Sequence, residues 1–380
     1  MKVITLHGTH VVTGPGSLEY LKQIECSRAM VITGGKSMFA SGVIDKVQSF
    51  LQRDGSEILV YPGISKNPTK EQVLKALEAA NRFQPDLFVA VGGGSPIDAA
   101  KAVMLFYEHP ELNFDNVTRA ELPQTKGRTR LIAIPSTSGT ASEVTHVTVI
   151  TYPEKNLKVA FRTEIIRPDI AILDGDLPLT LPKQIVAETG MDALTHALEC
   201  YVNKTGDTFT DALAKSAVEG IVRWLPVSYE TGSIESRQKM HDYQCMAGMA
   251  FSNAGLGMVH GVSHAFGGMF NLAHGLANAV ILPYSMNYNR KDTFVAERYR
   301  ILSDALGSSV IEVVEKLGQK LGIPHCFAEY GIEEDRFLQS YDALVENSML
   351  GATAANPIQV PVGDMKKFVR CVYYGTRVDF

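Results

Sequence analysis

Residues 87–101 decide the fold, and they read LFVAVGGGSPIDAAK. An apolar run typical of a buried strand leads directly into three glycines and then into a helix that begins near Pro96. Glycines let backbone N–H groups approach a ligand closely, and the start of a helix carries positive partial charge, so this arrangement can bind a phosphate. It is neither the G-x-G-x-x-G fingerprint nor a Walker A loop, which leaves a simple tight turn between strand and helix as the alternative.

Strands and helices alternate on both sides of this stretch. Apolar strands are predicted at 3–6, 11–14, 29–33, 57–61, 131–135 and 168–174. Helices are predicted at 18–24, 43–54 and 69–81. A hairpin is predicted from the runs 147–151 and 157–161. Strands that alternate with helices predict a parallel sheet covered by helices.

The strand pattern disappears from residue 181 onward. Helices are predicted from 182, at 207–225 with an end before Pro226, and at 237–254, 293–306, 309–321, 334–346 and 362–374. The sequence therefore predicts two domains, an α/β domain over 1–180 and an all-α domain over 181–380.

Composition excludes several classes of protein. The chain has 380 residues, of which 45% are hydrophobic and 20% charged, as in ordinary globular enzymes. The formal net charge of −5 offers no basic surface for nucleic acid. No apolar run could span a bilayer and residues 1–8 lack a signal-peptide pattern, so we expect no membrane partner and a cytoplasmic location. The five cysteines contain no C-x-x-C pair and are expected to be free thiols.

A second group of residues carries metal-binding chemistry. Asp192 and His196 are four residues apart in a helix-forming stretch, so both lie on one face of that helix. His260 and His264 repeat this spacing, and His274 follows. One carboxylate with several imidazoles suits Fe²⁺ or Zn²⁺, whereas Mg²⁺ and Ca²⁺ prefer oxygen ligands. Each residue alone would more often be an ordinary surface or core residue, but their clustering among small residues favours a metal site.

Around these residues the chain resembles the iron-containing (group III) alcohol dehydrogenases. The matching stretches are 190–197 (GMDALTHA), 260–265 (HGVSHA) and 274–279 (HGLANA), and the resemblance runs through almost the whole chain. It implies a dehydroquinate synthase-like fold, whose α/β domain binds a dinucleotide and whose helical domain binds metal and substrate. The metal ligands that it implies are Asp192, His196, His260 and His274. His264 resembles the family's histidine near the substrate and is the candidate catalytic residue, as a proton relay.

The same resemblance implies a set of contacts to the cofactor. The family's Gly-Gly-Gly-Ser-x-x-Asp segment, which holds the pyrophosphate, corresponds to Gly92, Gly93, Gly94, Ser95 and Asp98, with Asp98 on the nicotinamide side. A hydroxyl-rich segment that contacts the nucleotide corresponds to Ser136, Thr137, Thr140 and Thr145. Lys158 matches a lysine that reaches the cofactor, and Leu177 matches an apolar residue near the nicotinamide. From the residues alone, the hydroxyl-rich segment could also be an ordinary polar loop, and Lys158 could be an exposed lysine on an edge strand.

The residues that follow the strand at 29–33 bear on which nicotinamide cofactor is used. NAD-using members of the family have an aspartate there, which pairs with the ribose hydroxyls and repels a 2′-phosphate. Here Gly34, Gly35 and Lys36 follow the strand, which places a cation and no carboxylate at this position. We therefore predict that NADP(H) is accepted and preferred over NAD(H). The alternative is that Lys36 is only a solvent-exposed side chain and that both cofactors bind.

Together these features predict an alcohol dehydrogenase or aldehyde reductase that transfers a hydride between NAD(P)(H) and a small primary alcohol or aldehyde. The metal, Fe²⁺ by resemblance with Zn²⁺ as the alternative, would act as a Lewis acid on the reacting oxygen. A homodimer or larger homo-oligomer is implied by the resemblance alone. The apolar residues expected around the ligands, which favour a small substrate, are Phe251, Leu256, Val259, Phe266 and Met269.

Three alternative functions remain open at this point. Glycerol dehydrogenases and dehydroquinate synthases resemble the same fold broadly. Dehydroquinate synthase needs several Lys and Arg residues for its anionic substrate, and none lies beside the metal-binding motifs. A non-catalytic metal-binding protein would not account for the glycine-rich loop.

Overall fold

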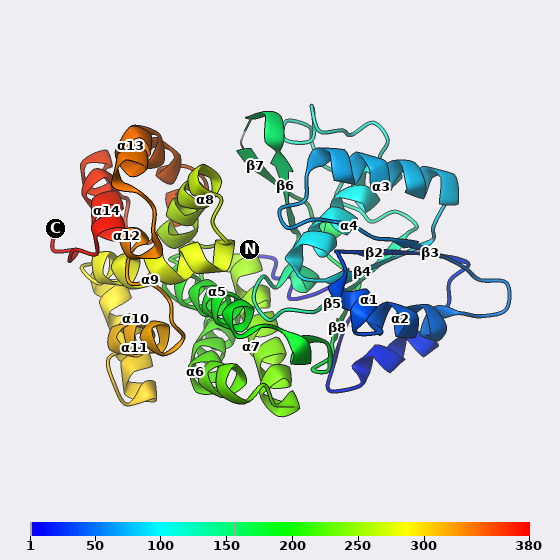
Figure 1. Cartoon of the computed structure of the whole chain (residues 1–380), viewed down its shortest axis with the longest axis horizontal. Helices are drawn as coiled ribbons and strands as arrows, with labels where there is room; N and C mark the ends of the chain where they lie inside the picture. Colours follow the sequence, from blue (N-terminus) through cyan, green and yellow to red (C-terminus); the bar gives the residue numbers. More distant parts are fainter. Residues whose placement is uncertain (1, 156) are drawn as a thin grey trace. The chain divides into compact units, whose positions relative to one another are not determined.

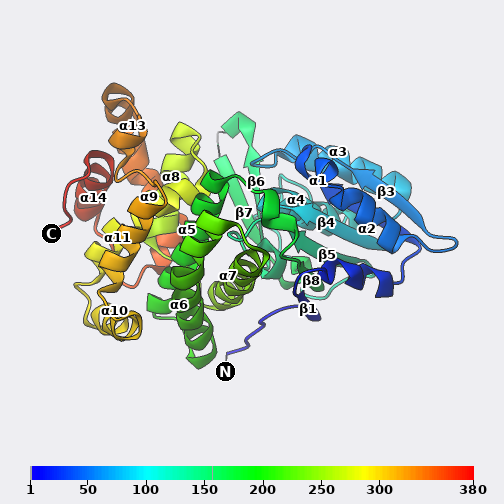
Figure 2. The ribbon, with the colours of Figure 1, turned by 60° about the horizontal axis from the view of Figure 1, so that its bottom comes forward.

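The computed structural model describes residues 2–155 and 157–380, and the chain forms two compact units, Met1–Thr180 and Leu181–Phe380. The first unit contains a parallel sheet with helices on both faces, and the second is built from helices (Figures 1 and 2). Among the described residues, no helix combines the length and the apolar character needed to cross a membrane.

A six-stranded parallel sheet forms the centre of the first unit. Its strand order is β1-β8-β5-β4-β2-β3. The strands are β1 (His10–Thr13), β2 (Arg28–Thr33), β3 (Glu57–Tyr61), β4 (Leu87–Gly92), β5 (Arg130–Pro135) and β8 (Ile170–Leu173). The predicted hairpin forms a separate antiparallel pair, β6 (Val147–Tyr152) and β7 (Leu157–Arg162). The prediction of an α/β fold around a parallel sheet is confirmed.

The strands send alternate side chains into two apolar cores, one on each face of the sheet. The helical elements of this unit are η1 (Ser17–Gln23), α1 (Ser37–Ala40), α2 (Val43–Leu51), α3 (Lys70–Phe83), α4 (Gly94–Glu108), η2 (Ser142–Val144), η3 (Pro153–Lys155), η4 (Glu164–Ile166) and η5 (Leu177–Thr180). On β2, Met30 and Ile32 pack with residues of α3 and α4. Ala29 and Val31 pack with residues of η1 and α2 on the opposite face. Burial of both faces explains why these strands read as continuous apolar runs.

The structure corrects two predictions near the N-terminus. Residues 3–6 form no strand, and the chain joins the sheet only at His10, whose N–H donates to Asp169 O at 3.1 Å. Because the neighbouring strand β8 begins at Ile170, the residues before His10 have no strand to pair with. The helix predicted over 18–24 is the 3-10 helix η1 rather than an α-helix.

Helices make up the second unit, as predicted. They are α5 (Lys183–Val202), α6 (Thr208–Thr231), α7 (Ile234–Ala254), α8 (Met258–Phe270), α9 (His274–Asn289), α10 (Thr293–Leu306), α11 (Val310–Lys320), α12 (Phe327–Tyr330), α13 (Glu334–Ser348), η6 (Gly351–Ala355) and α14 (Val362–Tyr374). The predicted end before Pro226 is wrong, because α6 continues to Thr231. A proline removes one helix hydrogen bond, and the burial of Leu225 and Ser228 on either side of it outweighs that loss.

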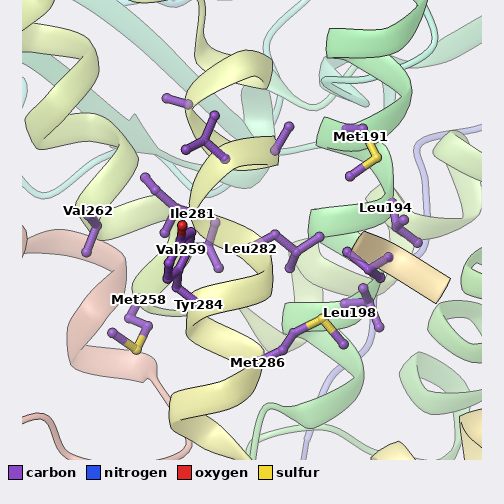
Figure 3. Close-up of a cluster of buried hydrophobic side chains, with 14 of the residues drawn as sticks. Met191, Leu194, Leu198, Met258, Val259, Val262, Ile281, Leu282, Tyr284 and Met286 are labelled. Atoms are coloured by element: carbon purple, nitrogen blue, oxygen red, sulfur yellow. The ribbon is translucent and has the colours of Figure 1, made fainter. Parts of the chain in front are cut away.

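One apolar cluster aligns the three helices that carry the candidate metal ligands. Helix α9 packs against both α5 and α8. Figure 3 shows buried side chains from all three helices in this cluster, among them Leu194, Leu282 and Val262. The approach of α9 to α5 requires a glycine, because a Cβ at Gly275 would lie 2.3 Å from the backbone oxygen of Glu188. The packing therefore fixes the position of His274, the residue just before this glycine.

A buried histidine in α7 makes the stability of the protein depend on pH. Burial lowers the pKa of His241 from 6.5 to about 4, so the folded protein keeps this ring neutral. The unfolded chain binds a proton below pH 6.5, so the stability contribution is complete above that pH and is lost as the pH falls toward 4. A full loss of about 3 kcal/mol corresponds to this shift.

We expect His241→Gln to reduce the pH dependence of Tm between pH 6.5 and 4, since glutamine does not titrate. Thermal unfolding across this range, followed by circular dichroism, measures the slope. The exposed His10→Gln is the matched control and should leave the slope as it is in the parent. An identical slope in His241→Gln and the parent would show that another group causes the loss.

Candidate active site

The glycine-rich and hydroxyl-rich loops lie at the carboxyl ends of the neighbouring strands β4 and β5. Gly92 pairs with Pro135 in the parallel register, and Ser136 N donates to Gly92 O at 2.8 Å. A Cβ at Gly94 would lie 2.8 Å from Thr140 Cγ2, so the loops touch where only glycine fits. The carboxyl ends of parallel strands are the usual place for a dinucleotide. The predicted cofactor residues at this place are Gly92, Gly93, Gly94, Ser95, Ser136, Thr137 and Thr140.

Asp98 and Thr145 belong to a buried polar network that joins α4 to the chain after the hydroxyl-rich loop. Asp98 accepts hydrogen bonds from Ser142 Oγ at 2.5 Å and from Val149 N at 2.9 Å. Lys101 Nζ, fully buried, donates to Ser142 Oγ at 2.9 Å and to Thr145 Oγ1 at 3.1 Å. Burial raises the pKa of Asp98 and lowers that of Lys101 to about 8. Through these hydrogen bonds, Asp98 and Thr145 help to hold the hydroxyl-rich loop against α4.

The segment predicted to select the cofactor follows β2, beside the glycine-rich loop. Thr33 pairs with Val91 in the register of β2 and β4, so Gly34 leaves the sheet next to the first glycine of that loop. Gly35 and Lys36 are exposed. The Lys36 ammonium is therefore accessible to a ligand at this edge of the sheet.

Two predicted cofactor residues have contacts of their own elsewhere in the first unit. Lys158, on β7, donates from Nζ to Asn67 Oδ1 at 2.8 Å, and burial lowers its pKa. Leu177 is 4% exposed and packs in the apolar core with residues of the parallel strands.

Three helices of the second unit bring potential metal ligands together. Asp192 on α5, His260 on α8 and His274 at the start of α9 each offer one ligand atom, and these atoms all lie within 4.8 Å of one another. His274 Nε2 is 3.8 Å from Asp192 Oδ1. Asp192 and His260 are buried, while His274 is partly exposed. We call these three residues the ligand cluster, and one oxygen with two imidazole nitrogens suits Fe²⁺ or Zn²⁺.

The protonation states of the ligand cluster leave lone pairs available for a metal. Burial lowers the pKa of His260 well below its ordinary value, so its ring is neutral. Burial alone would raise the pKa of Asp192, but the neighbouring imidazoles of His196 and His274 overcome this effect and lower it. A neutral imidazole and an ionised carboxylate are the forms that bind metals.

A buried carboxylate orients His260. His260 Nδ1 lies 2.5 Å from Glu199 Oε2, and Val259 N donates to Glu199 Oε1 at 2.7 Å. When the Nδ1–H of His260 donates to Glu199, the lone pair on Nε2 is left for a metal. Burial raises the pKa of Glu199 to about 7, so the ionised form that accepts both bonds predominates above neutral pH.

His196 and His264 lie next to the ligand cluster. The His196 ring stacks on His260, with 4.7 Å between ring centroids, and on Phe251, with 4.4 Å. Among the described residues, His196 is not part of the group whose ligand atoms lie within 4.8 Å of one another. His264 is exposed, and its ring centroid is 5.2 Å from that of His274. The structure thus gathers all five predicted residues, and potential ligand atoms of three of them lie within 4.8 Å of one another.

Comparison with protein families covers both units. The family model described as iron-containing alcohol dehydrogenase matches residues 8–175, and the C-terminal model of the same family matches residues 186–373. The chain belongs to the iron-containing alcohol dehydrogenase family. It is therefore an oxidoreductase with alcohol dehydrogenase or aldehyde reductase activity, which this family membership favours over the lyase and scaffold alternatives.

Individual relatives of this alcohol dehydrogenase match along nearly its whole length. The NADPH-dependent butanol dehydrogenase of Clostridium saccharobutylicum is 44% identical over 379 residues, which cover 97% of each chain. An alcohol dehydrogenase of Thermococcus barophilus is 35% identical over 96% of this chain and 98% of its own. The solved iron-containing alcohol dehydrogenase of Thermococcus thioreducens is 34% identical, covers 99% of this chain and 100% of that chain, and has a TM-score of 0.91.

Three residues of this alcohol dehydrogenase were missed by reasoning from the sequence. Glu199 lies seven residues after Asp192 on α5, so the helical spacing that pairs Asp192 with His196 would have found it. Asn278 lies one turn after His274 on α9, and its side chain contacts the ligand cluster. Lys101 had no such signal, because nothing in the sequence distinguishes a buried lysine in a helix from an exposed one.

Proposed function

We propose that this alcohol dehydrogenase catalyses reversible hydride transfer between NAD(P)(H) and a small primary alcohol or aldehyde. The convergence of Asp192, His260 and His274 from three helices carries this proposal, because it supplies a metal site of suitable chemistry. The similarity to a butanol dehydrogenase supports a short, unbranched substrate. The touching glycine-rich and hydroxyl-rich loops support a dinucleotide, since side chains at the glycines would fill the space.

Asp192, His196, His260 and His274 would hold the metal. Fe²⁺ is the first choice because the family is iron-containing, and Zn²⁺ is the alternative, which the general order of metal affinities favours. When bound, such an ion supplies Lewis-acid polarisation of the alcohol or carbonyl oxygen. Glu199 would keep the His260 lone pair directed to the metal through its hydrogen bond to Nδ1.

His264 would move the proton of the reaction. It is exposed and lies beside His274, so it can exchange protons with solvent. In alcohol oxidation His264 would accept the proton of the alcohol O–H, and a bound nicotinamide would supply the acceptor for the hydride that the carbinol carbon loses. Aldehyde reduction reverses both transfers.

The apolar residues expected around the ligands differ in their exposure. Val259 and Phe266 are 1% and 0% exposed and pack in the core of the second unit. Phe251 is half-buried and stacks on His196, so it remains beside the proposed metal site. A bulky ring at this position supports a small substrate.

We propose that NADP(H) is the preferred cofactor and that Lys36 contributes to the preference. Lys36→Asp would replace an attractive charge with one that repels a 2′-phosphate. We expect the ratio of kcat/KM for NADPH to that for NADH to fall by about tenfold or more, since each tenfold is about 1.4 kcal/mol. Steady-state kinetics with both cofactors measures it.

Lys75→Asp is the control for the Lys36 variant, because Lys75 is an exposed lysine on α3 and gives the same charge change. Its cofactor ratio should match that of the parent. A parent enzyme that strongly prefers NADH, or a Lys36→Asp variant with an unchanged ratio, would remove Lys36 from the explanation.

We also propose a homodimer or larger homo-oligomer, as the family resemblance implies, and a cytoplasmic location, as expected from the lack of a signal-peptide pattern in residues 1–8. Light scattering coupled to size-exclusion chromatography tests the first, and cell fractionation tests the second. A monomer, or a protein found outside the cytoplasmic fraction, would contradict the respective proposal.

The activity is tested with protein purified without oxygen, stripped of metal and reloaded with Fe²⁺ or Zn²⁺. Oxidation of NADPH and NADH is followed with butyraldehyde and a series of short aldehydes. We expect aldehyde-dependent turnover that requires metal. Metal-loaded protein that is inactive with every short aldehyde would overturn the proposed substrate class.

A further inference from the structure

The side-chain amide of Asn278 lies among the atoms of the ligand cluster. Asn278 Nδ2 donates to Asp192 Oδ1 at 2.7 Å and lies 3.2 Å from Nε2 of both imidazoles, those of His260 and His274. Asn278 is fully buried. A single nitrogen therefore contacts an atom of each of the three residues of the ligand cluster, which are three of the four residues proposed to hold the metal.

The amide and a metal ion would compete for the same lone pairs. When Nδ1–H of His260 donates to Glu199, the lone pair of His260 lies on Nε2, the atom that is 3.2 Å from Asn278 Nδ2. A metal binds imidazole through this lone pair at about 2 Å, and one lone pair cannot serve both partners. The amide must therefore leave the two histidines when a metal binds.

The other end of the amide shows what fixes its orientation. Asn278 Oδ1 is buried and has no hydrogen-bond partner among the described residues, which costs stability. Exchanging the oxygen and the nitrogen would place Oδ1 against the ionised carboxylate of Asp192, which is unfavourable. The contacts of Nδ2 with the ligand cluster thus outweigh the stability cost of the unpaired Oδ1, and they fix the orientation of the amide.

We propose that Asn278 is a positioning residue that stands in for the metal ion. One of its two N–H groups donates to Asp192 and the other is shared between Nε2 of His260 and Nε2 of His274, so the amide holds the three ligand atoms together before metal binds. The side chain moves aside when metal binds. Asn278 therefore stabilises the metal-free protein more than the metal-loaded protein, and it lowers metal affinity. This inference rests on the proposed metal site.

Asn278→Ala tests the proposal in the full-length protein. After chelation, Tm and Zn²⁺ affinity are measured by calorimetry and by competition with a chromophoric chelator. We expect Tm of the metal-free variant to fall more than Tm of the loaded variant, and Zn²⁺ affinity to rise about five- to tenfold, as expected for one or two lost hydrogen bonds. Asn278→Ser keeps a smaller hydrogen-bond donor, so its Tm and its Zn²⁺ affinity should lie between those of Asn278→Ala and the parent.

Two control variants separate the possible failures. Asn287→Ala removes an amide on the same helix whose Nδ2 bonds Pro283 O at 3.0 Å, and it should leave Zn²⁺ affinity unchanged. His260→Ala should lose Zn²⁺ binding. The stand-in role would be overturned if Tm fell equally with and without metal. It would also be overturned if the Zn²⁺ affinity of Asn278→Ala and Asn278→Ser were unchanged or weaker. Either result would leave the proposed metal site intact. A parent that binds no Zn²⁺, Fe²⁺ or Co²⁺ would overturn the metal site and this inference with it.

Discussion

His260→Ala is expected to abolish metal-dependent turnover. The variant removes one residue of the ligand cluster, and Glu199 Oε2 loses its contact with His260 Nδ1. Loss of the several kcal/mol that a bound metal contributes to the transition state corresponds to a fall in kcat/KM on the order of 10³-fold. Metal content by mass spectrometry and turnover with butyraldehyde are measured on the same sample.

His264→Ala is the matched control, since His264 lies one turn further along the same helix. His264→Ala should keep its metal content but turn over butyraldehyde more slowly than the parent. The pH dependence of its turnover should also differ from that of the parent. Full metal content in His260→Ala would exclude His260 as a ligand. An unchanged rate and pH profile in His264→Ala would exclude the proton relay.

Glu199→Leu is expected to weaken metal binding by about 10- to 100-fold, the range found when a group that orients a histidine ligand is removed. Leucine fills a similar volume but accepts no hydrogen bond, so His260 Nδ1 and Val259 N both lose their acceptor. The His260 proton is then free to move to Nε2, which removes the lone pair. Competition with a chromophoric chelator measures the affinity of the purified variant.

Glu188→Leu provides the control for Glu199→Leu. Glu188 is also buried on α5, and its carboxylate accepts from Gln184 Nε2 at 2.8 Å, so it is a buried acid of the same helix. Its metal affinity should match the parent's, and Glu199→Gln should lose less than Glu199→Leu because an amide oxygen still accepts. Equal affinities in the two leucine variants would mean that Glu199 has only a packing role.

The strands and helices were predictable because local periodicity and burial pattern coincide. The boundaries of α10 and α14 agree residue for residue with their predicted ranges, since each helix has a clear apolar face between polar ends. Residues 3–6 have an equally apolar pattern but form no strand, because a strand needs a neighbour and the sequence does not show where β8 begins. The passage of α6 through Pro226 likewise depends on tertiary packing.

The candidate site was predictable only in part. The spacing of Asp192 and His196 placed two candidate ligands on one helical face, and the family resemblance supplied the others. The contacts that orient the ligands join distant residues, as in the pair Glu199 and His260, which are 61 residues apart. The contact of Asn278 with Asp192 spans 86 residues. Contacts of this length follow from how helices pack, which one sequence does not reveal.

Every proposed ligand, together with Glu199 and Asn278, belongs to the compact unit Leu181–Phe380, whereas the glycine-rich loop and Lys36 belong to Met1–Thr180. If these residues have the proposed roles, a mutation at Lys36 would change coenzyme choice without altering any metal ligand. Coenzyme preference and metal preference can therefore change independently during evolution, because different parts of the gene encode them. A protein engineer could exchange the first half of the coding sequence between relatives and expect the metal centre to be inherited intact.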